Sequence, residues 1–307
     1  MEIPLVDLAP WHGGARTDRR RVAAALDEAF GSVGFAVVTG HGIDQHMARA
    51  LRSTALDFFS LDDAVKERWQ VEHLGDAGWV PIGLEANGYI FGEDTPPDLN
   101  ETFAVRRGMP GHPDGWPALV TLARRHLEST SKVYETLVEA CALALDLEDP
   151  ELLVGPCRDA PNSMNINWYP AVDRVGPPLP GQYRIGPHTD FGTLTLLDRE
   201  PGLGCLQVQL PDDRWVDAPH VDGALIVNAA DLFALWSTGR WRSARHRVLP
   251  PSMNARAEQL VSLVCFCEAK PDTVITPLPG SDPAHWFEPV VAGEWIDARM
   301  AQITVAG

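Results

Sequence analysis

The sequence is short of basic residues. Lysine and arginine together number 25 in 307 residues, against 42 aspartates and glutamates, which gives a formal net charge of −17 at pH 7. Nucleic acids and anionic membrane surfaces are bound by basic faces, because their phosphate groups attract Lys and Arg. The scarcity of positive charge therefore excludes a nucleic acid or a membrane as the main partner.

Cysteines and long apolar segments are also scarce. Five cysteines at uneven spacing do not suggest the disulfide framework of a small secreted domain: Cys141, Cys157, Cys205, Cys265 and Cys267. No run approaches the ~20 apolar residues of a membrane-spanning helix, and the start of the chain lacks the basic and apolar segments of a secretory signal. We therefore expect a soluble protein of the reducing cytoplasm, in which Cys265 and Cys267 are small apolar residues of a buried strand.

Hydrophobic residues, by contrast, are abundant, at 45% of the chain with ten Trp and ten Phe. Such a composition builds a core and excludes intrinsic disorder. In the first half, residues 34–39 predict a short buried strand, and Asp44 can cap the helix that follows. Residues 78–117 are rich in Gly, Pro, Asn and Asp and predict a long irregular connection, whereas residues 118–147 predict one long helix.

After Pro156 the pattern changes to short β-branched or alternating runs separated by Gly, Pro and Asp. We expect about eight short strands there: residues 164–169, 193–197, 205–210, 215–217, 224–228, 247–249, 260–267 and 273–275. Such strands are typical of an antiparallel sandwich or jelly roll. The expected fold class is α+β with N-terminal and spine α-helices, and the order of the motifs described below favours a double-stranded β-helix (jelly-roll) core over a sandwich.

The change of pattern also suggests how the chain is divided. Residues 1–157 form an N-terminal α/β region that includes the long spine helix, and residues 158–307 form the jelly-roll core. No flexible linker separates them, so we expect one integrated domain. The sequence contains no indication of its oligomeric state.

Two histidines and an aspartate form a candidate metal site. His188 and Asp190 are two positions apart in a run that we expect to be a strand, so their side chains should point to the same face. His246, in a later expected strand, is the obvious third ligand, because a jelly roll brings distant strands side by side. Two His and one carboxylate on one face of a metal leave open positions, as in non-haem Fe(II) oxygenases.

Ordered motifs run along nearly the whole chain around these residues. They include residues 3–8 (IPLVDL), 34–43, 167–170 (NWYP), 188–197 (HTDFGTLTLL), 223–231 and 246–248. In this order and spacing they resemble the motifs of the isopenicillin N synthase-like branch of the Fe(II)/2-oxoglutarate-dependent oxygenases. Several motifs in register are far more specific than the H-x-D pair alone.

This resemblance implies Fe(II) bound by His188, Asp190 and His246, with 2-oxoglutarate and O2 as cosubstrates. It implies a dioxygenase, an oxidoreductase that hydroxylates, desaturates or cyclises a small-molecule substrate in secondary metabolism and releases succinate and CO2. Cosubstrate-binding residues are expected at three positions that match the family, and no catalytic residue is expected beyond the metal ligands. These positions are Asn167, Tyr169 and Ser262.

One strand departs from the family pattern. Relatives carry Arg-x-Ser there, and the arginine pairs with the far carboxylate of 2-oxoglutarate. This chain has Leu260 in place of that arginine, followed by Ser262. Arg184, which shares strand parity with His188, and Arg256, which lies just before the strand, are the two candidates to replace it. The simpler interpretation of each is a solvated surface arginine.

Leu260 keeps a second hypothesis open, an Fe(II) oxidase of the same fold that does not use 2-oxoglutarate. A third hypothesis is a jelly roll that has lost catalysis and only binds a ligand, although the complete set of metal-binding residues argues against it. Among other residues, His41 is expected to be a turn histidine rather than a ligand. The aromatic residues Trp168, Phe191 and Phe266 are candidates to line the substrate cavity.

Overall fold

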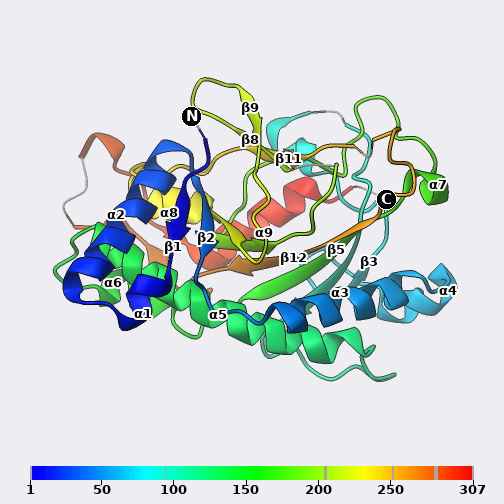
Figure 1. Ribbon diagram of the computed structural model, residues 1–307, viewed down its shortest axis with the longest axis horizontal. Coiled ribbons are helices and arrows are strands. Elements are labelled where there is room, and N and C mark those ends of the chain that lie inside the picture. Colours follow the sequence, from blue (N-terminus) through cyan, green and yellow to red (C-terminus); the bar gives the residue numbers. More distant parts are fainter. Residues whose placement is uncertain (1, 94, 204–205, 251, 280–282, 306–307) are drawn as a thin grey trace.

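The computed structural model describes residues 2–93, 95–203, 206–250, 252–279 and 283–305. Two β-sheets build the core, and helices cover the outer side of the larger sheet (Figure 1). This arrangement is the α+β jelly roll with helical cladding that the sequence predicts.

The larger sheet has eight strands and takes them from both halves of the chain. Its order is β1-β2-β10-β7-β12-β5-β4-β3, and neighbouring strands are antiparallel except β1 and β2. The strands are β1 (Leu5–Asp7), β2 (Phe35–Thr39), β3 (Gly78–Val80), β4 (Glu101–Arg106), β5 (Ser163–Tyr169), β7 (Leu194–Asp198), β10 (Leu225–Ala229) and β12 (Leu260–Cys267). Strands from before and after residue 157 are therefore hydrogen-bonded neighbours.

The smaller sheet has four strands in the order β6-β11-β8-β9. They are β6 (Ile185–His188), β8 (Leu206–Gln209), β9 (Trp215–Asp217) and β11 (His246–Val248). A separate pair, β13 (Val274–Ile275) and β14 (Val290–Val291), precedes the last helix.

The two faces of the larger sheet carry different side chains, because successive residues of a strand point to opposite sides. On β12, Leu263 and Cys265 belong to the apolar core under the helices, whereas Phe266 lines a cavity. On β5, Ile166 belongs to the same core and Asn167 lines the cavity. The inner face of the sheet is therefore the face that supplies polar and aromatic groups to a site.

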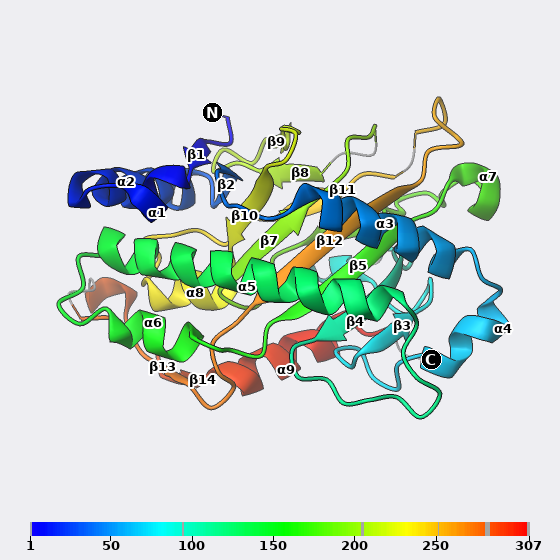
Figure 2. The same cartoon turned by 60° about the horizontal axis from the view of Figure 1, so that its bottom comes forward.

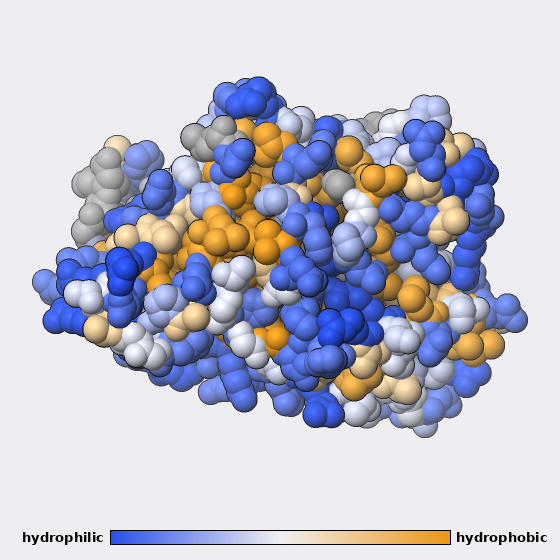
Figure 3. All heavy atoms as spheres, viewed as in Figure 1, coloured by the Kyte–Doolittle hydropathy of each residue, from blue (hydrophilic) through white to orange (hydrophobic). Residues whose placement is uncertain are grey.

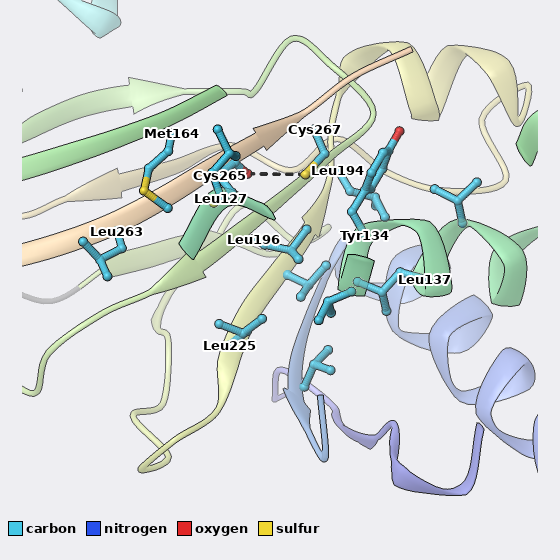
Figure 4. Close-up of a cluster of buried hydrophobic side chains, with 14 of the residues drawn as sticks. Leu127, Tyr134, Leu137, Met164, Leu194, Leu196, Leu225, Leu263, Cys265 and Cys267 are labelled. Atoms are coloured by element: carbon cyan, nitrogen blue, oxygen red, sulfur yellow. Dashed lines mark hydrogen bonds between the residues drawn. The ribbon is translucent and has the colours of Figure 1, made fainter. Parts of the chain in front are cut away.

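The helix α5 (Leu119–Ala144) is the spine helix expected from the sequence. The helix α3 (Gln45–Phe59) lies next to α5 on the same side of the larger sheet (Figure 2). Figure 4 shows where α5 meets the strands, with Leu127, Tyr134 and Leu137 of the helix near Leu194, Leu196, Leu225, Leu263, Cys265 and Cys267. Each fully buried leucine contributes roughly 1.5–3 kcal/mol relative to an exposed one. As expected, Cys265 and Cys267 are buried, unbridged residues of this core.

The remaining helices are α1 (Ala9–Gly13), α2 (Arg16–Ser32), α4 (Asp63–Lys66), α6 (Glu151–Cys157), α7 (Val172–Val175), α8 (Asp231–Trp236) and α9 (Ala292–Ile303). Short 3-10 helices span Glu67–Trp69, Asn87–Phe91 and Pro283–His285. The predicted cap of α3 is confirmed, since the carboxylate of Asp44 accepts a hydrogen bond from the backbone N–H of His46 at 2.8 Å.

Most predicted strands lie within two residues of the observed ones, and the strands over 215–217 and 260–267 coincide with β9 and β12. Residue 205, the first of one predicted strand, lies outside the described residues. The expectation of an irregular connection over 78–117 is wrong, because β3 and β4 fall within it. Gly, Pro and Asp residues flank these short strands, and because such residues are typical of turns and loops, the sequence pattern did not indicate the strands.

Hydrophilic side chains cover most of the face shown in Figure 3, and apolar side chains form patches between them. Within the described part of the chain, no helix has both the length and the apolar character needed to cross a lipid bilayer.

Candidate metal centre and cavity

His188, Asp190 and His246 converge at one point. His188 is the last residue of β6 and pairs directly with His246, the first residue of β11. The Nε2 atom of each histidine lies 3.7 Å from Oδ1 of Asp190, and one donor atom of each residue lies within 4.8 Å of the others. The expectation that the H-x-D pair lies in a strand is only half right, since β6 ends at His188 and Asp190 follows in the loop before β7.

Hydrogen bonds turn the donor atoms toward this point. Nδ1 of His188 is 2.8 Å from the carbonyl oxygen of Gly186, and Nδ1 of His246 is 3.2 Å from that of Ala244. A ring that donates through Nδ1 keeps the lone pair of Nε2 for a metal ion. The side-chain amide of Asn228 donates to Oδ2 of Asp190 at 2.7 Å, which leaves Oδ1 directed at the histidines.

The surroundings favour the protonation states that a metal ion requires, neutral imidazole and ionised carboxylate. Burial, followed by the nearby His246, lowers the pKa of His188 to about 4. Burial by itself would raise the pKa of Asp190, but His246, His188 and the hydrogen bonds to its carboxylate outweigh burial and hold that pKa below its usual value. Both shifts suit a cation between the three side chains.

The donor set fits Fe(II). Two imidazole nitrogens and one carboxylate oxygen on one side of the ion leave positions open on the other side. His188 and Asp190 line a cavity, so the open side faces a space that other molecules can enter. Behind the site, the ring of Phe35 on β2 packs edge-on against His246, with ring centroids 5.3 Å apart.

The cavity has a volume of about 920 Å³, within the range typical of small-molecule sites. Both sheets and α9 contribute to its wall, through Asn167 of β5, Phe266 of β12, Ile185 of β6 and Met300 of α9. The cavity therefore lies between the two sheets and is closed on one side by the last helix.

Acidic groups are prominent in the cavity wall, where Glu85, Glu268 and Asp297 lie with Arg106. Burial, followed by the charge of Asp98, raises the pKa of Glu85 to about 7. Burial also raises the pKa of Glu268 to about 7, against the opposing effect of Arg106. Carboxyl groups kept in so unfavourable an environment are candidates for ligand binding. Sequence reasoning missed Glu85 and Glu268, because neither belongs to a motif.

The three expected cosubstrate residues lie side by side on the inner face of the larger sheet. Asn167 of β5 pairs across the strands with Ser262 of β12, and Tyr169 pairs with Leu260. The Oδ1 atom of Asn167 accepts a hydrogen bond of 2.9 Å from the hydroxyl of Thr102. Burial raises the pKa of Tyr169, whose hydroxyl interacts with the side chains of Asn167 and Ser262.

The two arginines considered as replacements at position 260 have different surroundings. Arg184 is fully buried just before β6, and its guanidinium lies over the ring of Tyr169, 5.7 Å from the centroid. Arg256 is about half exposed and forms an ion pair of 2.8 Å with Asp173. Of these two, Arg184 is the one brought next to an expected cosubstrate residue.

The other sequence expectations have mixed outcomes. His41 is a turn histidine as expected, since its Nε2 is 2.8 Å from the carbonyl oxygen of Gly223 and its Nδ1 accepts a backbone hydrogen bond. Phe191 and Phe266 line the cavity. Trp168 does not, because its side chain points to the helical side and stacks on Phe59 at 5.5 Å.

Comparison of the sequence with models of known protein families gives two matches. A family model described as the N-terminal region of a non-haem dioxygenase in morphine synthesis matches residues 3–141. A second, described as the 2OG-Fe(II) oxygenase superfamily, matches residues 161–269. The second match contains His188, Asp190 and His246.

Named relatives match over most of their length. Validamycin A dioxygenase of Streptomyces hygroscopicus subsp. limoneus is 37% identical over 293 residues, which cover 90% of this chain and 79% of that protein. A homoarginine-6-hydroxylase of Glycine max is 27% identical and covers 90% of this chain and 88% of that protein. A crystal structure of a full-length Neurospora crassa protein in complex with alpha-ketoglutarate and thymine has a TM-score of 0.85 at 25% identity, over 97% of this chain and 96% of that one.

Proposed function

Since the chain belongs to the Fe(II)- and 2-oxoglutarate-dependent oxygenases, we propose that His188, Asp190 and His246 bind the Fe(II) of this enzyme. The 37% identity to a dioxygenase over 90% of the chain confirms the resemblance seen in the sequence. The protein is thus an oxidoreductase that uses Fe(II), 2-oxoglutarate and O2 to modify a small molecule. The observation that supports the ligand assignment is the convergence of three donor atoms at the wall of a cavity.

The bound Fe(II) supplies the redox chemistry that couples the decarboxylation of 2-oxoglutarate to the oxidation of substrate. The chain's own residues hold the ligands for that chemistry. The carbonyl groups of Gly186 and Ala244 fix the histidine rings, and Asn228 fixes the carboxylate of Asp190. Phe35 covers His246 from behind and keeps water away from that side.

For the cosubstrate we propose a site along the inner faces of β5 and β12. The hydroxyl groups of Tyr169 and Ser262 and the amide of Asn167 can donate hydrogen bonds to a carboxylate. They lie in one patch of neighbouring strand positions, and Asn167 also lines the cavity that contains His188.

The substrate we propose is a small polar molecule of secondary metabolism that carries a positive charge. The wall of the cavity supports this, because Glu85, Glu268 and Asp297 together outnumber the arginines beside them, Arg106 and Arg107. An ionised carboxylate in a partly dry cavity binds an ammonium or guanidinium group well. The relatives named above are a validamycin A dioxygenase and a homoarginine hydroxylase, both named for small molecules.

The test is turnover by the purified protein. Fe(II), 2-oxoglutarate and O2 should give succinate at a basal rate, and a panel of amines, amino acids and aminated sugars should include compounds that raise that rate. Substrate turnover without any succinate would contradict the use of 2-oxoglutarate. That result would revive the oxidase hypothesis, which the match to the 2OG-Fe(II) oxygenase superfamily model otherwise disfavours. An anaerobic titration that shows no Fe(II) binding would contradict the ligand assignment.

A further inference from the structure

The distal end of the proposed cosubstrate site has no arginine on β12. Leu260 occupies the position beside Tyr169, and its side chain packs against Gly202, where an added Cβ would lie 2.6 Å from Cδ1 of the leucine. An apolar side chain cannot neutralise the far carboxylate of 2-oxoglutarate. A buried carboxylate without a cation is strongly disfavoured, so a positive charge must come from elsewhere.

Arg184 brings a positive charge to the same place from the opposite sheet. It precedes β6, where its backbone N–H donates to the carbonyl oxygen of Val248, and its side chain is fully buried. The guanidinium lies over the ring of Tyr169, the direct strand neighbour of Leu260. The two sheets therefore place Arg184 and Leu260 around one tyrosine although they are distant in the chain.

Not every N–H donor of the Arg184 guanidinium is used in a strong hydrogen bond. Its two terminal nitrogens share a single oxygen of Glu258 at 3.3 and 3.4 Å, longer than strong charge-assisted bonds. Within the described part of the chain, its Nε has no hydrogen-bond partner. The other oxygen of Glu258 accepts from the backbone N–H of Leu203 at 2.8 Å, which fixes the glutamate. Glu258 thus holds the guanidinium in place without using all of its donors.

We propose that Arg184 binds the distal carboxylate of 2-oxoglutarate and replaces the arginine that relatives carry at position 260. This inference rests on the proposed function. Arg184 directly precedes β6 and His188 ends it, so the rise of a strand puts their Cα atoms at most about 13 Å apart. The carbon chain of 2-oxoglutarate and an arginine side chain together can bridge that distance. Tyr169 and Ser262 then add hydroxyl groups to the same carboxylate.

The test compares two ligands that differ only at the distal end. 2-Oxoglutarate and 2-oxopentanoate present the same 2-oxo acid to the metal, but 2-oxopentanoate has a methyl group where the second carboxylate would be. Each is titrated without O2 into the Fe(II) protein, and the visible charge-transfer band of the chelate reports binding. The variants are Arg184→Met, Arg184→Met with Leu260→Arg, and the matched control Arg256→Met.

The wild-type protein and the Arg256→Met control should prefer 2-oxoglutarate over 2-oxopentanoate by about 30-fold or more. Arg184→Met should lose that preference, because it weakens 2-oxoglutarate binding and leaves 2-oxopentanoate binding nearly unchanged. Adding Leu260→Arg should restore about tenfold or more of the preference, because an arginine then returns to the neighbouring position. An Arg184→Met protein that keeps the wild-type preference would overturn the assignment.

Loss of a buried cation can also unfold the protein, so circular dichroism and a thermal melt accompany each titration. If Arg184→Met does not fold, Arg184→Lys is used, which keeps the charge but loses the planar fork. It should weaken 2-oxoglutarate about tenfold and spare 2-oxopentanoate, and equal weakening of both ligands would overturn the proposal. A wild-type Fe(II) protein that gives no band with 2-oxoglutarate would instead overturn the proposed function and this inference with it.

Discussion

At the scale of single residues, His246 gives the most direct test of the proposed metal site. Its Nε2 is one of three converging donors, and its ring is enclosed by Phe35 and His188. His246→Ala should abolish Fe(II) binding and turnover, while the missing ring destabilises the fold by only about 1–3 kcal/mol. Anaerobic Fe(II) titration and a thermal melt measure the two effects separately. Retained turnover would contradict the assignment, and His220→Ala in an exposed loop is the control.

The acidic cavity wall gives a pH-dependent prediction. With a pKa of about 7, the carboxyl of Glu268 is ionised above neutral pH and protonated below it. If the substrate is cationic, the KM of the wild-type enzyme should rise as the pH falls from about 8 to about 6. Glu268→Gln should have a higher KM, about tenfold at high pH, and a shallower dependence of KM on pH, because Glu85 with its pKa of about 7 still titrates. A variant that keeps the wild-type slope would exclude this role, and the surface change Glu128→Gln should alter neither value.

Single residues also show what a sequence can reveal of a site. The proposed metal ligands His188, Asp190 and His246 could be selected from the sequence because the H-x-D pair lies within a long run of ordered motifs. The sequence offered both Arg184 and Arg256 as replacements for the missing arginine and could not choose between them, because a motif does not show which side chains lie close together in the fold. Only the fold shows that Arg184 lies over the ring of Tyr169, the strand neighbour of Leu260.

At the scale of elements, α5 is tied to the strand end beside the cavity through Tyr134. The hydroxyl of Tyr134 donates to the carbonyl oxygen of Glu268 at 2.8 Å and lies 2.8 Å from the hydroxyl of Thr193. Tyr134→Phe removes both contacts and leaves the carbonyl oxygen of Glu268 without this donor, while Thr193 keeps its 2.8 Å hydrogen bond to the carbonyl oxygen of Cys267. The substitution should lower the free energy of unfolding by about 1–3 kcal/mol. Urea denaturation measures this, and Lys132→Ala on the exposed side of α5 should change it little. An unchanged midpoint for Tyr134→Phe would show that the link is not structural.

Elements differed in how well the sequence predicted them. The helix over 118–147 and the strand over 260–267 were predictable because each has a long periodic or β-branched run without breakers. β3 and β4 were not, because Gly78 opens one strand and the other lies between Asn100 and Gly108. Their stability comes from the pairing of β4 with β5, a contact between distant parts of the chain.

At the scale of the whole molecule, the shared sheet makes a prediction about the proposed division near residue 157. β10 pairs with β2 and β5 pairs with β4, so a fragment of residues 158–307 would expose both sheet edges and the face that α5 covers. We expect this fragment to be insoluble or unfolded and unable to bind Fe(II), although it contains all three ligands. Size-exclusion chromatography and circular dichroism test this, and coexpression with residues 1–157 should restore a folded complex. A soluble fragment that binds Fe(II) would show that the jelly roll is autonomous.

The contact between Phe35 and His246 has a consequence for how such enzymes can diversify. The ring that backs a proposed iron ligand is encoded far upstream of that ligand, on β2. If recombination exchanged only the second half of the gene, the new residue at the His246 position would pack against a Phe35 that had not evolved with it. Heritable change in this scaffold is therefore more readily tolerated through point substitutions along the cavity than through exchange of gene halves.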